Sequence, residues 1–279
     1  MSQIKVCNDE DVLIIDFSYF IIYRYHALHT WFKLSQTDYS DDLYLEKYYK
    51  LAINNLQKFV KKLGIKKNVI LLGDCCRVNI WRMKLFPQYK ESRNLYWEKN
   101  PIVPNIFPMI ENELIPELTS KYGFQYCCKD TMEADDIAYC IKFKLRQLSF
   151  DKKIIMITND NDYLQLSDEM TNIVNLPSLK SIEKRGVDNS AKKSMILKIL
   201  AGDPSDNING VLSKKKTEDI LKSLTEEQCS FNEDSELITI LKNKKCNIDT
   251  VMINKKLIDM SEIPTELIDL ISIEIYTHS

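Results

Sequence analysis

Three short apolar segments, each ending in an aspartate, restrict the possible folds of this chain more than any other feature. They are Val12–Asp16, Val69–Asp74 and Ile154–Asp160. Each is rich in β-branched residues and is apolar without interruption until its polar end. This pattern is typical of strands buried on both faces of a parallel sheet. We therefore expect a parallel sheet whose strands each end in an acid.

Helical patterns lie between the three segments. Apolar residues recur at helical spacing over residues 45–63, and helices are also expected over 110–122 and 134–148. Strands that alternate with helices imply right-handed crossovers in an α/β core. The sequence therefore predicts a twisted parallel sheet flanked by helices.

The character of the chain changes near residue 181. Lysine becomes more frequent, strand patterns become rare, and short helical patterns follow, the last over residues 265–276. We expect a catalytic core over residues 1–185 and a helical subdomain over 186–279. Residues 77–108 mix basic and aromatic residues with little periodicity, and connections of this length are usually functional or mobile.

Composition excludes several classes of protein. A chain of 279 residues with 44% hydrophobic residues can bury a core, and its most apolar stretch, residues 12–23, is too short and polar to span a bilayer. The glycines form neither a dinucleotide-binding nor a P-loop motif, and three histidines are too few for most zinc hydrolases. Eight cysteines without a C-x-x-C pattern suggest reduced thiols, hence a cytoplasmic or nuclear location.

Acidic residues gather where a parallel sheet would bring them together. Ligands bind at the carboxyl ends of parallel strands, and Asp16, Asp74 and Asp160 all stand there. Taken singly, an aspartate after a strand is more often a helix cap or turn residue. The set that converges numbers nine carboxylates: Asp16, Asp74, Glu133, Asp135, Asp136, Asp160, Asp162, Asp203 and Asp206.

Carboxylates packed this closely repel one another unless cations balance them. Mg²⁺ prefers carboxylate and water oxygens, and two such ions a few ångströms apart form a site that hydrolyses phosphodiesters. The sequence therefore predicts a two-ion Mg²⁺ centre, in which Mn²⁺ can substitute.

The acidic blocks occur in the order found in the 5′-nuclease superfamily, which includes flap endonucleases and 5′→3′ exonucleases. The resemblance spans about residues 12–224 and rests on Leu13–Asp16, Leu72–Asp74, Glu133–Asp136, Thr158–Leu166 and Gly202–Val211. Among the members, the chain most resembles viral 5′-nucleases such as the ribonuclease H proteins of T-even phages.

The resemblance implies a PIN-like 5′-nuclease core with a helical arch at about residues 77–108 and a helical DNA-binding subdomain. It implies that the nine acids bind the metal ions: eight as ligands, and Asp203 beside them. Lys90 and Arg93 match the family's Y-K-x-x-R element at the base of the arch and would contact the scissile phosphate, while Tyr89 would stack on a base. The further DNA contacts that it implies are Arg24, Arg82, Lys214, Lys215, Lys216 and Thr217.

One stretch departs from the family. Most relatives continue the last acidic block with a glycine-rich turn that holds a phosphate with the help of a monovalent cation. Here Gly210 is followed by Val-Leu-Ser and three lysines, which weighs against a K⁺ site. Lys216 and Thr217 still match the family pattern.

The expected activity is metal-dependent hydrolysis of DNA at 5′ ends, nicks or flaps, with RNA–DNA hybrids as further substrates, in replication, repair or recombination. We expect a monomer, with replication proteins as possible partners, no membrane association, and a location that includes the host cell of a virus or phage. Two alternatives are a PIN-type endoribonuclease, whose domains are shorter and lack the 202–211 block, and a non-catalytic binder of branched DNA, which has no use for so many acids.

A formal net charge of −2 argues at first against a nucleic-acid partner. Without the nine acids the rest of the chain is net basic, with lysine and arginine clustered over residues 58–67, 77–93, 180–198 and 214–216. We therefore interpret the charge as an acidic catalytic pocket within a basic binding surface.

Overall fold

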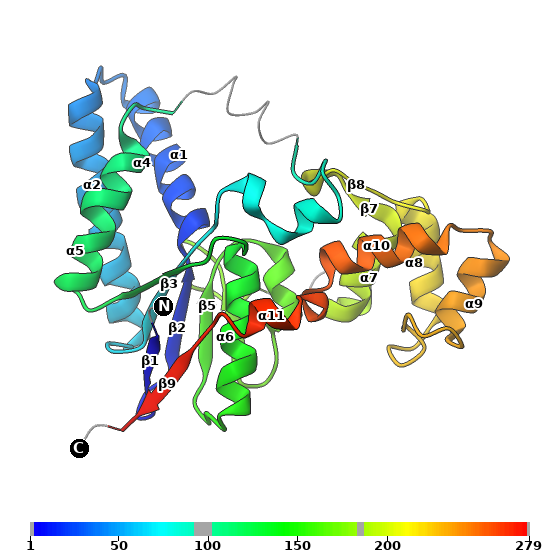
Figure 1. The fold of residues 1–279 in the computed structure, drawn as a ribbon. Coiled ribbons are helices and arrows are strands. Elements are labelled where there is room, and N and C mark those ends of the chain that lie inside the picture. Colours follow the sequence, from blue (N-terminus) through cyan, green and yellow to red (C-terminus); the bar gives the residue numbers. More distant parts are fainter. Residues whose placement is uncertain (1–2, 92–101, 183–186, 278–279) are drawn as a thin grey trace. The chain divides into compact units, whose positions relative to one another are not determined.

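The computed structural model describes residues 3–91, 102–182 and 187–277 of the chain (Figure 1). These residues form two units, each made of segments that are distant in sequence. Unit 1 comprises Met1–Arg77, Asn100–Ile182 and Glu266–Ser279, and unit 2 comprises Val78–Lys99 and Glu183–Thr265. The end of the chain thus belongs to unit 1, whereas the expected boundary placed all residues after 185 together.

Unit 1 is built on a five-stranded parallel sheet with the strand order β4-β3-β2-β5-β6. The strands are β2 (Val12–Asp16), β3 (Val69–Gly73), β4 (Gln125–Cys128), β5 (Ile154–Ile157) and β6 (Thr171–Val174). The three segments predicted as buried parallel strands are the three central strands, and every residue of β2 and β3 is buried. This confirms the predicted fold class.

Helices cover both faces of this sheet (Figure 1). They are α1 (Phe17–Ser35), α2 (Asp41–Leu63), α4 (Ile106–Met109), the π-helical segment η3 (Ile110–Leu114), α5 (Ile115–Ser120) and α6 (Ala134–Gln147). Leu13 and Ile15 of β2 share one apolar core with α1, α2 and α5. α6 contacts β2, β3 and β4 and lies on the opposite face in the view of Figure 1.

The two ends of the chain pair with each other in unit 1. β1 (Ile4–Cys7) and β9 (Ile273–Tyr276) form a separate parallel pair. The helix predicted over residues 265–276 is therefore wrong beyond α11 (Thr265–Ile268). The isoleucines at 271, 273 and 275 alternate with polar residues, and this period-2 pattern fits a strand that finds a partner in β1.

Unit 2 is mainly helical. Its helices are α7 (Ala191–Ala201), α8 (Lys214–Ser223), α9 (Glu236–Asn243) and α10 (Ile248–Ile258). Two antiparallel strands of two residues each, β7 (Gly202–Asp203) and β8 (Ile208–Asn209), lie between α7 and α8. The short helical turns of the chain are η1 (Arg77–Asn79), η2 (Trp81–Lys84), η4 (Asn161–Leu166), η5 (Val187–Asn189), η6 (Pro204–Asp206) and η7 (Met260–Glu262).

Residues 77–108, the expected arch, are described only in part. The first half forms two 3₁₀ turns and the last residues enter α4, while residues 92–101, including Arg93, lie outside the described residues. All eight cysteines are free thiols. In the part of the chain that the structure describes, no helix combines the length and the apolarity needed to cross a membrane.

Candidate functional site

The sheet of unit 1 brings its strand-end aspartates to one edge. Asp16 ends β2, Asp74 follows β3 directly, and Asp160 lies three residues after the end of β5. Because β2 pairs with both β3 and β5 in parallel, the three residues stand at the same carboxyl edge. We call the seven acids of this region the acidic edge: Asp16, Asp74, Glu133, Asp135, Asp136, Asp160 and Asp162.

Asp16 is the most deeply buried strand-end acid, with 7% of its surface exposed. Its carboxylate accepts hydrogen bonds from the Tyr19 N–H (3.0 Å) and the Thr158 hydroxyl (2.9 Å). Burial, together with the charges of Asp74 and Asp160, raises the pKa of Asp16 to about 7 against the lowering effect of these two bonds. The charged form of the Asp16 carboxylate is therefore disfavoured, and a nearby cation would stabilise it.

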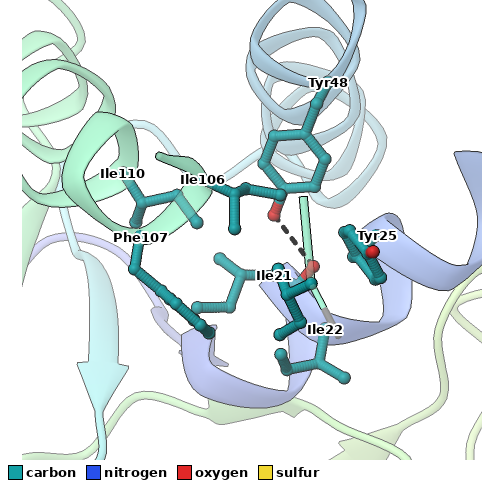
Figure 2. A pocket seen from close by; sticks show the side chains of 8 residues that line it. Ile21, Ile22, Tyr25, Tyr48, Ile106, Phe107 and Ile110 are labelled. Atoms are coloured by element: carbon teal, nitrogen blue, oxygen red, sulfur yellow. Dashed lines mark hydrogen bonds between the residues drawn. The ribbon is translucent and has the colours of Figure 1, made fainter. Parts of the chain in front are cut away.

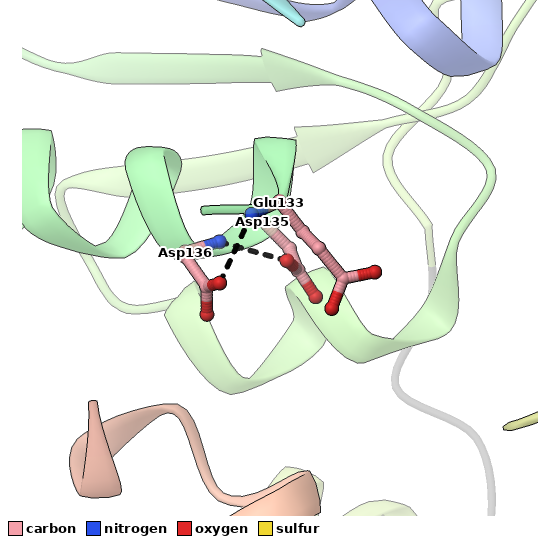
Figure 3. Close-up of side chains that lie close together, drawn as sticks. All are labelled: Glu133, Asp135 and Asp136. Atoms are coloured by element: carbon pink, nitrogen blue, oxygen red, sulfur yellow. Dashed lines mark hydrogen bonds between the residues drawn. The ribbon is translucent and has the colours of Figure 1, made fainter. Parts of the chain in front are cut away.

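Three acids at the start of α6 form the tightest group (Figure 3). Glu133, Asp135 and Asp136 can each offer a carboxylate oxygen, with these atoms all within 4.8 Å of one another. Asp136 accepts a hydrogen bond from the Glu133 N–H (3.1 Å), which ties the group to the helix N-terminus. Asp74 accepts from the Ala134 N–H (2.7 Å), so this group is joined to the end of β3.

The 158–163 segment adds the remaining acids of the edge. The Asp160 N–H donates to the Thr158 hydroxyl (3.1 Å), and the Asp162 N–H donates to the Asp160 carboxylate (2.9 Å). Thr158 therefore links Asp160 to Asp16, a role that the sequence motif alone did not reveal.

Tyr163 is a second residue that sequence reasoning missed. Its hydroxyl is buried, with 1% of the residue exposed, and meets no hydrogen-bond partner among the described residues. Burial raises the pKa of Tyr163 well above its usual range, and the nearby charges of Asp16 and Asp135 add to this. A buried polar group without a partner is costly, so this hydroxyl favours a water or hydrated ion beside the acids.

The donor set of the acidic edge fits a hard divalent cation. All seven side chains offer carboxylate oxygens, which Mg²⁺ and Mn²⁺ prefer. The raised pKa of Asp16 and the unpartnered hydroxyl of Tyr163 are what a site lacking its positive charge would show. The residues present therefore suit the ions that the sequence predicts.

Asp203 and Asp206, the other predicted metal ligands, belong to the 202–210 loop of unit 2 and are paired with lysines. Asp203 lies 2.8 Å from the Lys198 ammonium and accepts from the Ser205 N–H (3.0 Å). Burial alone would raise the pKa of Asp203, but Lys198 and Ser205 outweigh it, so that this pKa is lowered.

Lys90 lies against the same loop. Its ammonium is 3.7 Å from the Asp206 carboxylate, and its N–H donates to the Asp206 carbonyl (3.0 Å). The Tyr89 hydroxyl donates to the Asp206 carboxylate at 3.2 Å. Tyr89 is only 2% exposed, so the structure places it inside unit 2, and stacking on a base is not open to it in this conformation.

Two further predicted DNA contacts are also interior. Arg82 is 2% exposed and donates to the Leu257 carbonyl. Thr217 is fully buried, and its hydroxyl donates to the Ser213 carbonyl (3.1 Å). We therefore give Arg82, Tyr89 and Thr217 structural roles in place of the expected direct contacts.

The remaining predicted contacts are accessible. Lys214, Lys215 and Lys216 are exposed in the first turn of α8. Arg24, on α1 of unit 1, is half-buried and lies over the Tyr23 ring. Basic side chains at a helix N-terminus suit phosphate binding, and these four residues stay predictions.

A separate small apolar pocket lies in unit 1 (Figure 2). Its lining comes from α1, α2 and the segment around α4, and it consists of isoleucine, phenylalanine and tyrosine side chains. The Tyr48 hydroxyl donates to the Ile21 carbonyl (2.8 Å). Unlike the acidic edge, this pocket is lined by no carboxylate, amine or thiol.

Comparison with known proteins identifies relatives of this chain. The family described as 5'-3' exonuclease, N-terminal resolvase-like domain, matches residues 11–195. A 5'-3' exonuclease of Buchnera aphidicola subsp. Acyrthosiphon pisum (strain APS) is 30% identical over 165 residues, which are 57% of this chain and 52% of the relative. The chain thus spans about half the length of this curated relative.

Solved structures share the fold. The T5 5'-exonuclease with divalent metal ions (zinc) bound has a TM-score of 0.67 at 17% identity, covering 94% of this chain and 96% of that one. A flap endonuclease of bacteriophage T5 in a pseudo-enzyme-product complex with DNA and metal ions has a TM-score of 0.61 at 17% identity, with the same coverage. At this level of identity the likeness concerns the fold.

Proposed function

We propose that this chain, which belongs to the family of 5'-3' exonucleases with an N-terminal resolvase-like domain, is a nuclease that hydrolyses DNA phosphodiesters with divalent metal ions. The expected substrates are 5′ ends, nicks and 5′ flaps. RNA–DNA hybrids, as in primer removal, are a further substrate class of the same proposal.

The observation that carries the proposal is the crowding of acids at the edge of the unit 1 sheet. Asp74 joins the end of β3 to the group at the start of α6 through the Ala134 N–H. Asp16 is held at a raised pKa by burial and by two further acids. Asp16, Glu133 and Asp136 are buried, and carboxylates are seldom buried unless a charged partner or a metal ion holds them.

The chemistry divides between the ions and the side chains. Mg²⁺ ions bound here would supply an activated water and would stabilise the charge on the leaving oxygen. The acids of the edge hold and space the ions, and Asp136 fixes the start of α6 through the Glu133 N–H.

Lys90 and Arg93 complete the proposal as phosphate contacts. A lysine charge aimed at a phosphodiester stabilises the negative charge that develops in the transition state. The accessible lysines at the start of α8 would bind the phosphates of the duplex, and Arg24 would add a contact from α1. In this proposal, Asp206 holds Lys90 in place and Asp203 is balanced by Lys198.

Product mapping on matched substrates tests the proposal. A 5′-labelled DNA flap, a nicked duplex, an RNA-primed duplex and an RNA flap of the same sequence are incubated with Mg²⁺ or with EDTA. We expect 5′-phosphorylated products from the DNA substrates only with the metal. Cleavage confined to the RNA flap would favour an endoribonuclease, and tight flap binding without cleavage would favour a DNA-structure binder.

A further inference from the structure

The turn that carries Lys90 is unusually well buried for a basic segment. Arg82 and Tyr89 are each 2% exposed, Trp81 is 7% exposed and Lys90 is 8% exposed. Lys84, in the same 3₁₀ turn as Arg82, is exposed. Buried charges are retained only where specific partners hold them, so the contacts of Arg82 indicate its role.

Arg82 connects two elements of unit 2. Its Nε–H donates to the Leu257 carbonyl at 2.8 Å. That carbonyl belongs to the last turn of α10, where helix carbonyls lack partners along the helix and where a positive charge is favourable. The guanidinium carbon also lies 4.7 Å from the centre of the Trp81 ring and 6.0 Å from the centre of the Tyr89 ring.

Lys90 needs such support because of its backbone. Its φ of 56° lies in the left-handed region, which costs free energy for a residue with a side chain. The Lys90 N–H is bonded to the Asp206 carbonyl, and the Asn207 side-chain amide donates to the Gln88 carbonyl at 3.0 Å. Two hydrogen bonds therefore tie the turn to the 202–210 loop, and the Arg82 guanidinium lies near the ring of Tyr89, the residue before Lys90.

We propose that Arg82 is a positioning residue that fixes the Tyr89–Lys90 turn and thereby sets the position of the Lys90 ammonium. Arg82 acts through Tyr89 and Lys90 and has no direct contact with the substrate. This inference rests on the proposed function for its catalytic consequence, because Lys90 matters to the reaction only if it contacts the phosphate. The anchoring itself is a property of the protein without substrate.

Lysine cannot replace arginine in this arrangement. The planar guanidinium can lie against aromatic rings while its Nε–H donates in the plane, whereas an ammonium group is a point charge without a face. Arg82→Lys therefore keeps the charge and removes the geometry. Lys84→Met is the matched control, since it removes a positive charge from the same turn at an exposed position.

Amide hydrogen exchange tests the anchoring without DNA or metal. In Arg82→Lys we expect exchange of the Lys90 amide to accelerate about tenfold, because the turn opens more often, while protected amides in α7 keep their rates. Lys84→Met should leave the Lys90 amide unchanged. An unchanged Lys90 amide in Arg82→Lys, or an equal acceleration throughout unit 2, overturns the proposal.

A double-mutant cycle tests the consequence for catalysis. Arg82→Lys should lower kcat for flap cleavage about tenfold with little change in KM, and it should have no further effect in a Lys90→Met background. Additive losses in the double variant would mean that Arg82 does not act through Lys90, and would overturn the proposal.

The two experiments separate this inference from the proposed function. If Lys90→Met cleaves at the full rate, then the role of Lys90 as a phosphate contact fails, and the exchange experiment still decides the anchoring. If Lys90→Met is impaired and Arg82→Lys changes neither exchange nor kcat, the positioning role alone fails. Tyr89→Phe, which removes only the hydroxyl bond to Asp206, should produce a smaller acceleration of the same amide.

Discussion

The acids of the two units differ in what balances their charge. In unit 1, Asp16 is buried beside other carboxylates and its pKa is raised to about 7. In unit 2, Asp203 is equally buried, with 7% of its surface exposed, but Lys198 lies at 2.8 Å and its pKa is lowered. Asp206 likewise has Lys90 within 3.7 Å.

In the proposed function, this difference separates the acids that bind a metal ion from those that hold a lysine. The unit 2 loop supplies its own positive charge, and its acids hold basic side chains in place. In the acidic edge of unit 1, burial and the neighbouring carboxylates raise the pKa of Asp16, so a divalent ion beside this acid would stabilise its charged form. Sequence motifs treat the nine acids as one set, whereas the structure separates them by their electrostatic surroundings.

The largest effect should come from the tightest group of acids. Asp135→Asn removes one carboxylate of the α6 group, and we expect flap cleavage in Mg²⁺ to fall by about 10³-fold because the ions are held less firmly. The matched control is Glu169→Gln, which removes an exposed acid of unit 1 and should retain the wild-type rate. Equal rates for the two variants would contradict the assignment of the metal centre.

Loss of Lys90 should have the next largest effect. Lys90→Met removes the proposed phosphate contact, and kcat should fall by about 10²-fold, as for other single groups that stabilise transition-state charge. Single-turnover cleavage with saturating Mg²⁺ measures this directly. Full activity of Lys90→Met would confine Lys90 to a structural role with Asp206.

The third prediction concerns stability in the absence of metal. The folded-state pKa of Asp16 lies above the unfolded value of 3.8, so the folded protein binds this proton more tightly. In EDTA the contribution of Asp16 to the free energy of unfolding should therefore be greatest below about pH 4 and should fall, by on the order of a few kcal/mol, as the pH rises through 7. Asp16→Asn should show a flatter profile in urea titrations between pH 4.5 and 8.

Mg²⁺ should have the opposite effect on stability and raise the free energy of unfolding. Added Mg²⁺ should restore stability to the wild type at pH 8 more than to Asp16→Asn. A wild-type profile that is flat in EDTA and parallel to that of the variant would contradict the electrostatic account of the acidic edge.

The smallest effect should arise in unit 2, and it should have the opposite dependence on pH. Lys198→Met removes the lysine partner of Asp203 and should cost about 1 kcal/mol of unfolding free energy at pH 7. Because the folded-state pKa of Asp203 is lowered, this contribution is present above the usual value of 3.8 and is lost as the pH falls below it. Urea titrations at pH 7 and pH 3 measure the difference, which should be smaller at the lower pH.

The central strands were predictable because they are buried on both faces. β2 and β3 are apolar almost throughout, and a continuous apolar run of this length is typical of a strand buried on both faces of a parallel sheet. The edge strand β4 was missed, because Gln125–Cys128 is partly exposed and lacks a continuous apolar run. The spacing over residues 265–276 predicts a helix in place of β9, because the pairing of β9 with β1 depends on a segment nearly 270 positions earlier in the chain.

The sequence could predict those acids of the candidate site that stand at the ends of parallel strands. Asp16, Asp74 and Asp160 could be placed together because parallel strands end at one edge. The lysine partners of the unit 2 acids could not be foreseen in this way. Lys90 meets Asp206 across 116 positions of sequence, and no local pattern marks Tyr163 as a buried hydroxyl without a partner.

The most direct test of the central claim is a titration with Mn²⁺ followed by electron paramagnetic resonance, in which bound ions lose the signal of free Mn²⁺. The wild type should bind Mn²⁺ at pH 7.5, and Asp135→Asn should bind it at least about tenfold more weakly. Lys198→Met and Glu169→Gln should bind as the wild type does. A wild type that binds no Mn²⁺, or an Asp135→Asn variant with unchanged affinity, would contradict the claim that the acidic edge of unit 1 is the metal centre.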